Sequence, residues 1–148
     1  MGVLSAKQQA SSDSSIESLQ PLSDESRDFI QKSLDAWCAN LGYKDSTVNM
    51  LTLSRTLCIS KDELSVFFDL HLKTTFRIWL GDIRFNAAKN MMLEYPDYSN
   101  DIISAECGFS ARTYLYRIFK LKEGCTPTEW HIYLMYIMPL ITNGKLAN

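Results

Sequence analysis

The sequence is poor in metal-ligating pairs. It has two histidines, and no two of its four cysteines are separated by only two residues. With so few and such widely spaced ligands, we expect no metal site and no cofactor. Two disulfides are formally possible, but the spacing does not resemble a compact secreted framework and favours free thiols in a reducing compartment. The residues concerned are Cys38, Cys58, Cys107, Cys125, His71 and His131.

The motifs of common enzymes are also missing. The chain contains no H-E-x-x-H sequence, no glycine-rich loop of the kind that cradles phosphates, and no plausible nucleophile–histidine–acid set. These motifs supply the chemistry of most hydrolases and phosphoryl transferases. We therefore predict that the protein is not an enzyme.

Long hydrophobic runs are absent. The longest apolar stretch, Trp130 to Ile141, contains His131 and Pro139 and is shorter than the ~20 residues that span a bilayer. The chain does not open with a basic start followed by an apolar run, which a secretory signal would require. We therefore expect a soluble cytoplasmic protein that does not contact the membrane.

An excess of basic charge is missing as well. The chain has 15 Lys and Arg against 17 Asp and Glu, a formal net charge of −2. Taken alone, this balance argues against a nucleic-acid binder. Residues 1–45, however, hold 4 basic and 7 acidic side chains, whereas residues 46–148 hold 11 and 10. The acidity therefore lies in the front of the chain.

What the sequence does have is helical periodicity. Hydrophobic residues make up 46% of the 148 residues and aromatic residues 11%, enough for one compact domain with a sizeable core. Apolar side chains recur every three or four positions, and no segment alternates convincingly with period two. We therefore predict an all-α fold.

Capping signals mark the expected helix boundaries. The segments 60–63 and 126–129 are capping boxes, and the second has proline at the first helical position. A small polar residue is favoured before a helix, and glycine after one. The residues expected to begin helices are Ser23, Ser60, Ser99, Ser110 and Thr126, and those expected to end them are Gly42, Gly108 and Gly124.

The spacing of apolar residues also predicts which faces are buried. For the first helix these residues are Phe29, Ile30, Leu34, Trp37, Cys38 and Leu41. A longer helix is expected from Thr74 or Thr75 to just before Pro96, with Arg84 opposite a one-sided stripe of Phe76, Trp79, Leu80, Ile83, Ala87 and Met91.

A repeat of about fifty residues runs through the pattern. Each copy reads as a short helix, a tight turn and a second helix, which is the helix-turn-helix arrangement. A linker helix of roughly 20 residues would measure about 30 Å, close to the ~34 Å repeat of B-DNA. The second helices of the two copies are thus expected to enter successive major grooves. The matching residues are Leu53, Ser54, Cys58, Ile59 and Ser60 in the first copy, and Ile103, Ser104, Gly108, Phe109 and Ser110 in the second.

The predicted organisation has six parts. They are a flexible tail (1–23), a leading helix (24–44), a first helix-turn-helix unit (45–74), a linker helix (75–95), a second helix-turn-helix unit (96–131) and an apolar C-terminal extension (132–148).

Residues 108–120 contain a G-F-S turn and an aromatic-rich helix ending in F-K, and residues 124–130 follow the pattern G-x-T-P-x-E-[YW]. With these motifs, the chain over roughly residues 45–131 resembles the AraC/XylS-type transcription regulators of bacteria. The resemblance implies an all-α domain of about seven helices that binds double-stranded DNA and is usually joined to a separate sensor or dimerisation domain, here outside this chain. Further matches to the family pattern are Phe76, Trp79, Arg84, Ala88 and Lys89 in the linker helix, and Ser60, Leu64 and Phe68 in the first unit.

The second unit carries the stronger signal for DNA binding. Residues 110–124 hold four basic side chains and one acidic side chain. If Leu115, Ile118 and Phe119 face the core, helical geometry turns the intervening polar residues outward. Arginine pairs bidentately with guanine, threonine and tyrosine contact thymine methyls or phosphate, and lysine suits phosphate. The candidate DNA-binding residues are Arg112, Thr113, Tyr116, Arg117 and Lys120.

The first unit departs from the family pattern. Residues 60–73 hold two basic and three acidic side chains, and Val66 and Lys73 stand where the family usually has a basic or polar residue and a glycine. Lys61, Asp62 and Ser65 are its candidate DNA contacts, Asp62 by accepting from a cytosine amino group. We therefore predict that affinity and specificity depend mainly on the second unit.

Two further questions stay open at the level of sequence. The extension over 132–148 is expected to pack back on the domain, and the alternative is an exposed apolar face for self-association or contact with RNA polymerase. For the whole chain, the alternative to a transcription regulator is a protein-interaction module that keeps the fold but has lost DNA recognition.

Overall fold

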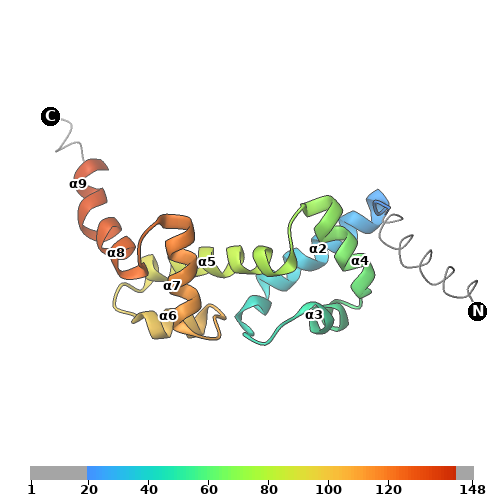
Figure 1. Ribbon diagram of the computed structural model, residues 1–148, viewed down its shortest axis with the longest axis horizontal. Helices are drawn as coiled ribbons and strands as arrows, with labels where there is room; N and C mark the ends of the chain where they lie inside the picture. The colour runs from blue at the N-terminus through green and yellow to red at the C-terminus, as the bar shows by residue number, and fades with distance from the viewer. Residues whose placement is uncertain (1–19, 143–148) are drawn as a thin grey trace, which may run out of the picture. The chain divides into compact units, whose positions relative to one another are not determined.

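The computed structural model describes residues 20–142 (Figure 1). Within this range the chain is helical and contains no strand, so the all-α prediction is confirmed. Most of the predicted flexible tail over residues 1–23 lies outside the described part. The helices are α2 (Asp24–Ala39), η1 (Gly42–Lys44), α3 (Met50–Leu57), α4 (Lys61–Val66), η2 (Phe67–Leu72), α5 (Phe76–Glu94), α6 (Asn100–Glu106), α7 (Arg112–Glu123), α8 (Pro127–Ile132), η3 (Tyr133–Ile137) and α9 (Met138–Thr142).

The helices form two compact units. The first compact unit contains most of α2, up to Ala36, together with α3, α4 and η2, which lie within Met50–Thr75. The second compact unit contains η1, within Trp37–Asn49, and the helices from α5 to α9, which begin at Phe76.

The first unit is built largely as its sequence predicts. The amide of Ser26 donates to Ser23 Oγ at 3.2 Å, and the amide of Glu63 donates to Ser60 Oγ at 3.1 Å, so both predicted caps are present. The expected inward position of Phe29 is wrong, because its side chain is 59% exposed. The buried apolar residues of this unit are Ile30, Leu34, Leu53, Ile59, Leu64, Phe67 and Phe68.

The first helix does not end at Gly42 as predicted. It ends at Ala39, and the chain reverses at Leu41, which has φ +65° and an exposed side chain. Gly42 serves a different purpose, because a Cβ atom there would overlap the ring of Trp37. Glycine at position 42 thus allows the chain to pass close to the tryptophan.

The long helix α5 begins and ends within two residues of the predicted bounds, but its buried face is different. Of the expected stripe only Leu80 is buried; Ala87 and Met91 lie at the edge of the core, and Trp79 stacks on Trp37 with ring centroids 6.1 Å apart. The helix contacts η1 as well as α6 and α7, so its apolar residues point in several directions and no single stripe describes them. The other buried residues of α5 are Phe85, Ala88 and Met92.

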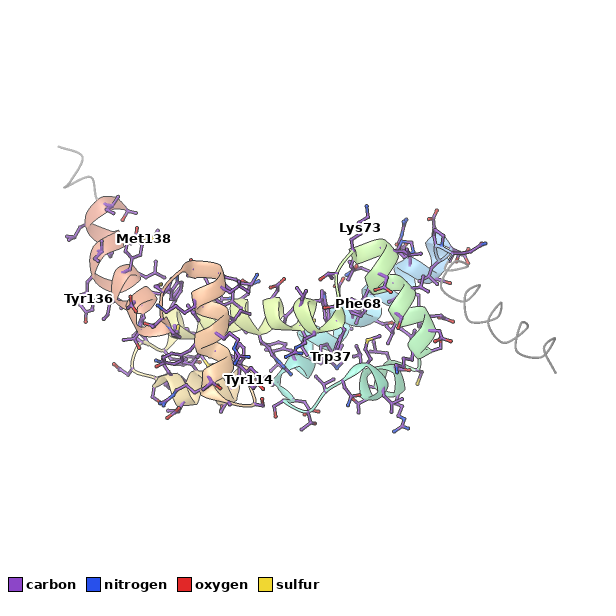
Figure 2. The ribbon with its side chains drawn as sticks, in the orientation of Figure 1. Trp37, Phe68, Lys73, Tyr114, Tyr136 and Met138 are labelled. Atoms are coloured by element: carbon purple, nitrogen blue, oxygen red, sulfur yellow. The ribbon has the colours of Figure 1, made fainter. Side chains whose placement is uncertain are left out.

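The C-terminal helices depart from the prediction in one respect. Thr126 caps α8 by accepting from the amide of Glu129 at 3.1 Å, as expected. Beyond it, Leu134 packs against the core, but most of the following side chains are exposed. Figure 2 shows Tyr136, which is 71% exposed, and Met138 on this terminal helix. For the described residues 132–142 the expected packing back is therefore wrong, because a helix that is apolar on every side cannot bury all its apolar side chains against one neighbour. Residues 143–148 of the predicted extension lie outside the described part. Self-association or contact with RNA polymerase through this face stays a prediction.

Candidate nucleic-acid interface

The two copies of the repeat share the same turn. In each copy the residue after the turn donates its N–H to a carbonyl five residues earlier, from Ile59 to Ser54 at 3.1 Å and from Phe109 to Ser104 at 3.0 Å. The helices that follow begin at Lys61 and Arg112, which are fifty-one positions apart, one more than the spacing of the two turns. The sequence repeat is therefore a structural repeat.

The turn of the second copy is tightly enclosed. Gly108 has φ +89°, and a Cβ atom there would overlap the carbonyl oxygen of Tyr43. The same carbonyl accepts from Arg84 Nε at 2.9 Å, and Arg84 Nη2 donates to the carbonyl of Asp45 at 2.8 Å. Arg84 thus holds the segment after α2 against the turn, which is a structural role.

The charges around this contact are consistent with that role. Burial lowers the pKa of Arg84, and the nearby Asp45 carboxylate partly offsets this effect. A hydrogen bond from the Thr47 hydroxyl, at 2.6 Å, is the main cause that lowers the pKa of Asp45. The Asp45 carboxylate is therefore ionised at neutral pH and lies close enough to Arg84 to stabilise its positive charge.

Helix α7 (Figure 1) has a buried apolar side and an exposed polar side. Leu115 and Phe119 are fully buried, and at about 100° per residue Thr113, Arg117 and Lys120 fall on the opposite side. All three are exposed. The helix begins one residue later than predicted: Ala111 is the N-cap instead of Ser110, and no side chain caps the first turn.

One flank of this face is tied to α6. Arg112 Nη1 lies 3.3 Å from Asp101 Oδ1, and Asn100 Nδ2 donates to the hydroxyl of Tyr116 at 2.9 Å. Asn100 also donates to Thr128 Oγ1 at 2.9 Å, which links α6, α7 and α8. Two of the five predicted contacts in this unit are therefore already engaged within the protein.

The other flank was missed by the sequence analysis. Tyr114 is 42% exposed and Leu121 is 82% exposed, and Figure 2 shows Tyr114 on α7. The Arg117 guanidinium lies 5.3 Å from the centre of the Tyr114 ring, a cation–π distance. A helical projection centred on Arg117 would have found both residues.

The ion pairs identify which cations stay available. Lys122 pairs with Asp82 at 2.6 Å and Lys89 with Glu123 at 2.9 Å. Among the described residues, no acidic side chain pairs with Arg117 or Lys120. These two cations can therefore bind a phosphate or a base edge without first giving up a carboxylate.

The first copy presents a weaker surface. Lys61 and Asp62 are exposed in the first turn of α4, and Ser65 is half-buried. Val66 is also half-buried and stands where α7 has Arg117. Asp62 and Glu63 place negative charge in this first turn. This charge interacts favourably with the helix dipole and stabilises the helix, but it repels an approaching phosphate.

The described residues contain neither a membrane-spanning helix nor a metal-binding cluster. None of the helices there is both long and apolar enough to cross a membrane. No cluster of three or more histidine, cysteine, aspartate or glutamate side chains in that part of the chain is placed to hold a metal ion.

Comparison with known proteins identifies the family. A family model described as a helix-turn-helix domain matches residues 53–131, which contain both copies of the turn. The chain belongs to the AraC-type helix-turn-helix family. It therefore carries the helix-turn-helix domain of DNA-binding transcription regulators.

A solved structure agrees with the AraC-type assignment. It is the C-terminal domain of the two-component response regulator yesN from Fusobacterium nucleatum, which is 27% identical to this chain and has a TM-score of 0.59. The match covers 68% of this chain and 97% of the other. No curated protein matches this chain.

Proposed function

We propose that this AraC-type chain is a sequence-specific DNA-binding transcription regulator in which α7 reads the major groove. The observation that carries the proposal is the exposed side of α7, where Arg117 and Lys120 have no acidic partner among the described residues. A helix fits the major groove, where each base pair presents a distinct pattern of donors and acceptors.

Each residue of this face suits a different contact. Arg117 suits a bidentate contact with guanine, and Thr113 suits a thymine methyl or a phosphate oxygen. Lys120, a flexible point charge near the end of α7, suits a backbone phosphate. Tyr116 is held by Asn100, so its ring reaches the groove in a fixed orientation. Arg112 must exchange Asp101 for DNA, and this exchange reduces what the new contact adds.

The first copy contributes less in this proposal. Lys61 can neutralise a phosphate, Asp62 can accept from a cytosine amino group, and Ser65 is only partly accessible. Each contact is single and lies beside acidic neighbours. We infer that this copy mainly orients the chain on the duplex, while α7 supplies most of the specificity.

The test is selection of bound genomic fragments, followed by footprinting and by fluorescence anisotropy on the selected site. Arg117→Ala is expected to weaken binding by about ten- to a hundredfold, because a bidentate arginine–guanine pair discriminates by about 1–3 kcal/mol. Ser65→Ala and Lys61→Ala are expected to weaken it by less than about threefold. Arg27→Ala removes the same charge outside both copies and is the matched control.

Two results would contradict the proposal. Binding that survives Arg117→Ala but is lost in Ser65→Ala or Lys61→Ala would move the reading helix to the first copy. An affinity that does not change with salt would indicate that phosphate contacts do not drive binding, and would favour the protein-interaction module.

A further inference from the structure

A cavity of about 520 Å³ opens beside α7. All of its lining residues belong to the second unit. Its volume lies in the range of small-molecule sites, and its walls are mostly apolar, as such sites are. On the α5 side it is lined at Gly81, which has no side chain to fill it. The apolar wall residues are Phe76, Leu80, Phe109, Ile118 and Leu121.

The charge around the cavity has one sign. Three arginines line it and no acidic residue does. Arg84 is engaged with the carbonyls of Tyr43 and Asp45. Arg77 and Arg117 are exposed, and no acidic side chain of the described residues pairs with either. An occupant with a single anionic group would therefore find, at the edge of an apolar cavity, two guanidinium groups that have no acidic partner among the described residues.

From this combination we infer that the cavity is a binding site for an apolar monocarboxylate. The carboxylate pairs with Arg77 and Arg117, which offer planar donor pairs that match its two oxygens. The hydrocarbon part displaces water from the aromatic and aliphatic walls. A sugar or a polar nucleoside fits poorly, because such a ligand needs many hydrogen-bond partners. The cavity lining offers only three uncharged polar side chains, those of Asn49, Ser110 and Tyr114. Duplex DNA supplies anions but leaves the apolar walls in water.

Occupancy has a consequence for DNA binding that rests on the proposed function. Arg117 belongs both to this cavity and to the exposed face of α7. A carboxylate bound to Arg117 withdraws that guanidinium from guanine, so ligand and DNA each lower the affinity for the other by the same factor. The site thus provides a direct means of lowering DNA affinity within this chain.

Binding is tested by isothermal titration of the full 148-residue chain with decanoate. The controls are decanol, which has the same apolar chain without the charge, and acetate, which has the charge without the chain. Decanoate is expected to bind at least tenfold more tightly than either. Absence of decanoate binding, or equal binding of decanol, would overturn the proposal.

Two variants locate the site. Gly81→Leu places a side chain in the cavity from α5 without changing the charge. The backbone tolerates a side chain there, since a Cβ atom at position 81 lies at an ordinary contact distance of 3.6 Å from Ile118 Cδ1. It is expected to reduce decanoate affinity at least tenfold. Arg77→Gln, at an exposed position where folding is not in question, is expected to reduce it at least fivefold. Arg27→Gln is the control. Unchanged affinity in both cavity variants would place decanoate elsewhere and overturn the assignment.

The effect on DNA is measured separately by anisotropy. Saturating decanoate is expected to weaken DNA binding at least threefold in the wild-type chain and not in Gly81→Leu. If decanoate binds but DNA affinity does not change, the competition is wrong and the site stands. If the wild-type chain binds no DNA at all, the proposed function fails, while the titration still decides on the cavity.

Discussion

The two helix-turn-helix copies share one backbone but differ in charge and in the turn. Equivalent positions of the two copies lie fifty-one residues apart. The second copy has Thr113, Arg117 and Lys120 where the first has Asp62, Val66 and Asp69. The backbone hydrogen bonds of the turn are the same in both copies, so the turn itself is kept although these outer residues differ. The difference shows that one scaffold can be kept while its outer face is changed, because exposed positions of a helix contribute little to its packing.

The turns differ at one residue. The first copy places Cys58 at φ +55°, where the second has Gly108 at φ +89°. Cys58 is exposed, whereas Gly108 is enclosed by Tyr43 and Arg84. A side chain can be accommodated at positive φ where solvent lies beside it, at a cost in backbone energy, but not where another backbone passes.

The largest effect is expected from removing glycine at the second turn. Gly108→Ala should lower the free energy of unfolding by about 3 kcal/mol, through backbone strain and displacement of the Tyr43 carbonyl. Urea denaturation followed by circular dichroism measures it. A loss below about 1 kcal/mol would mean that the segment held by Arg84 moves aside freely, and that the two turns are equivalent after all.

The reverse change at the first turn should stabilise. Cys58→Gly is expected to raise the free energy of unfolding by about 1 kcal/mol, because glycine adopts positive φ without the steric cost of a Cβ atom. The same denaturation experiment tests it, with Cys58→Ser as the control that keeps the strain. A destabilised glycine variant would show that the cysteine side chain contributes more than its backbone conformation costs.

A charge exchange sharpens the comparison of the outer faces. Lys120→Ala should make the slope of log affinity against log salt shallower by about 1, and Asp69→Lys should make it steeper by up to about 1. Anisotropy titrations between low and moderate salt measure both slopes, with Lys32→Ala as the control outside both copies. If Asp69→Lys leaves the slope unchanged, the second helix of the first copy does not approach a phosphate there.

The smallest effect concerns the thiols of the two copies. Burial is the main cause that raises the pKa of Cys107 from 9.0 to about 11. The folded state thus favours the neutral thiol, whose contribution to stability is fully present below pH 9 and is lost as pH rises through 11. At pH 8, Ellman's reagent should modify the exposed Cys58 readily and Cys107 only after unfolding. If the thiol that reacts fastest with Ellman's reagent is still present in Cys58→Ser, the assignment of that thiol to Cys58 is wrong.

Local sequence signals predicted much of the fold. Ser23, Ser60, Ser99 and Thr126 cap helices as expected, since a cap is made with an amide only three residues away. The repeat and the start of α7 near residue 110 could also be read from spacing. Ser110 itself was one residue off, because Ala111 adopts the extended conformation of the N-cap.

The faces of α5 and the state of the cations could not be read in this way. Trp79 turns to Trp37 and Arg84 to the Tyr43 carbonyl, and both partners lie about forty positions earlier in the chain. Periodicity records that a residue is apolar but not which neighbour covers it. A helix with neighbours on several sides therefore gives no clear stripe.

Helix boundaries, the duplicated turn and the family were thus encoded in residues close together in the chain, where capping and backbone preference act. Tertiary structure decided which side chains of α7 stay free. Asp101 and Asp82 neutralise Arg112 and Lys122, while Arg117 and Lys120 keep their charge exposed. An ion pair forms only between groups that folding brings within a few ångströms, and that distance is set by packing.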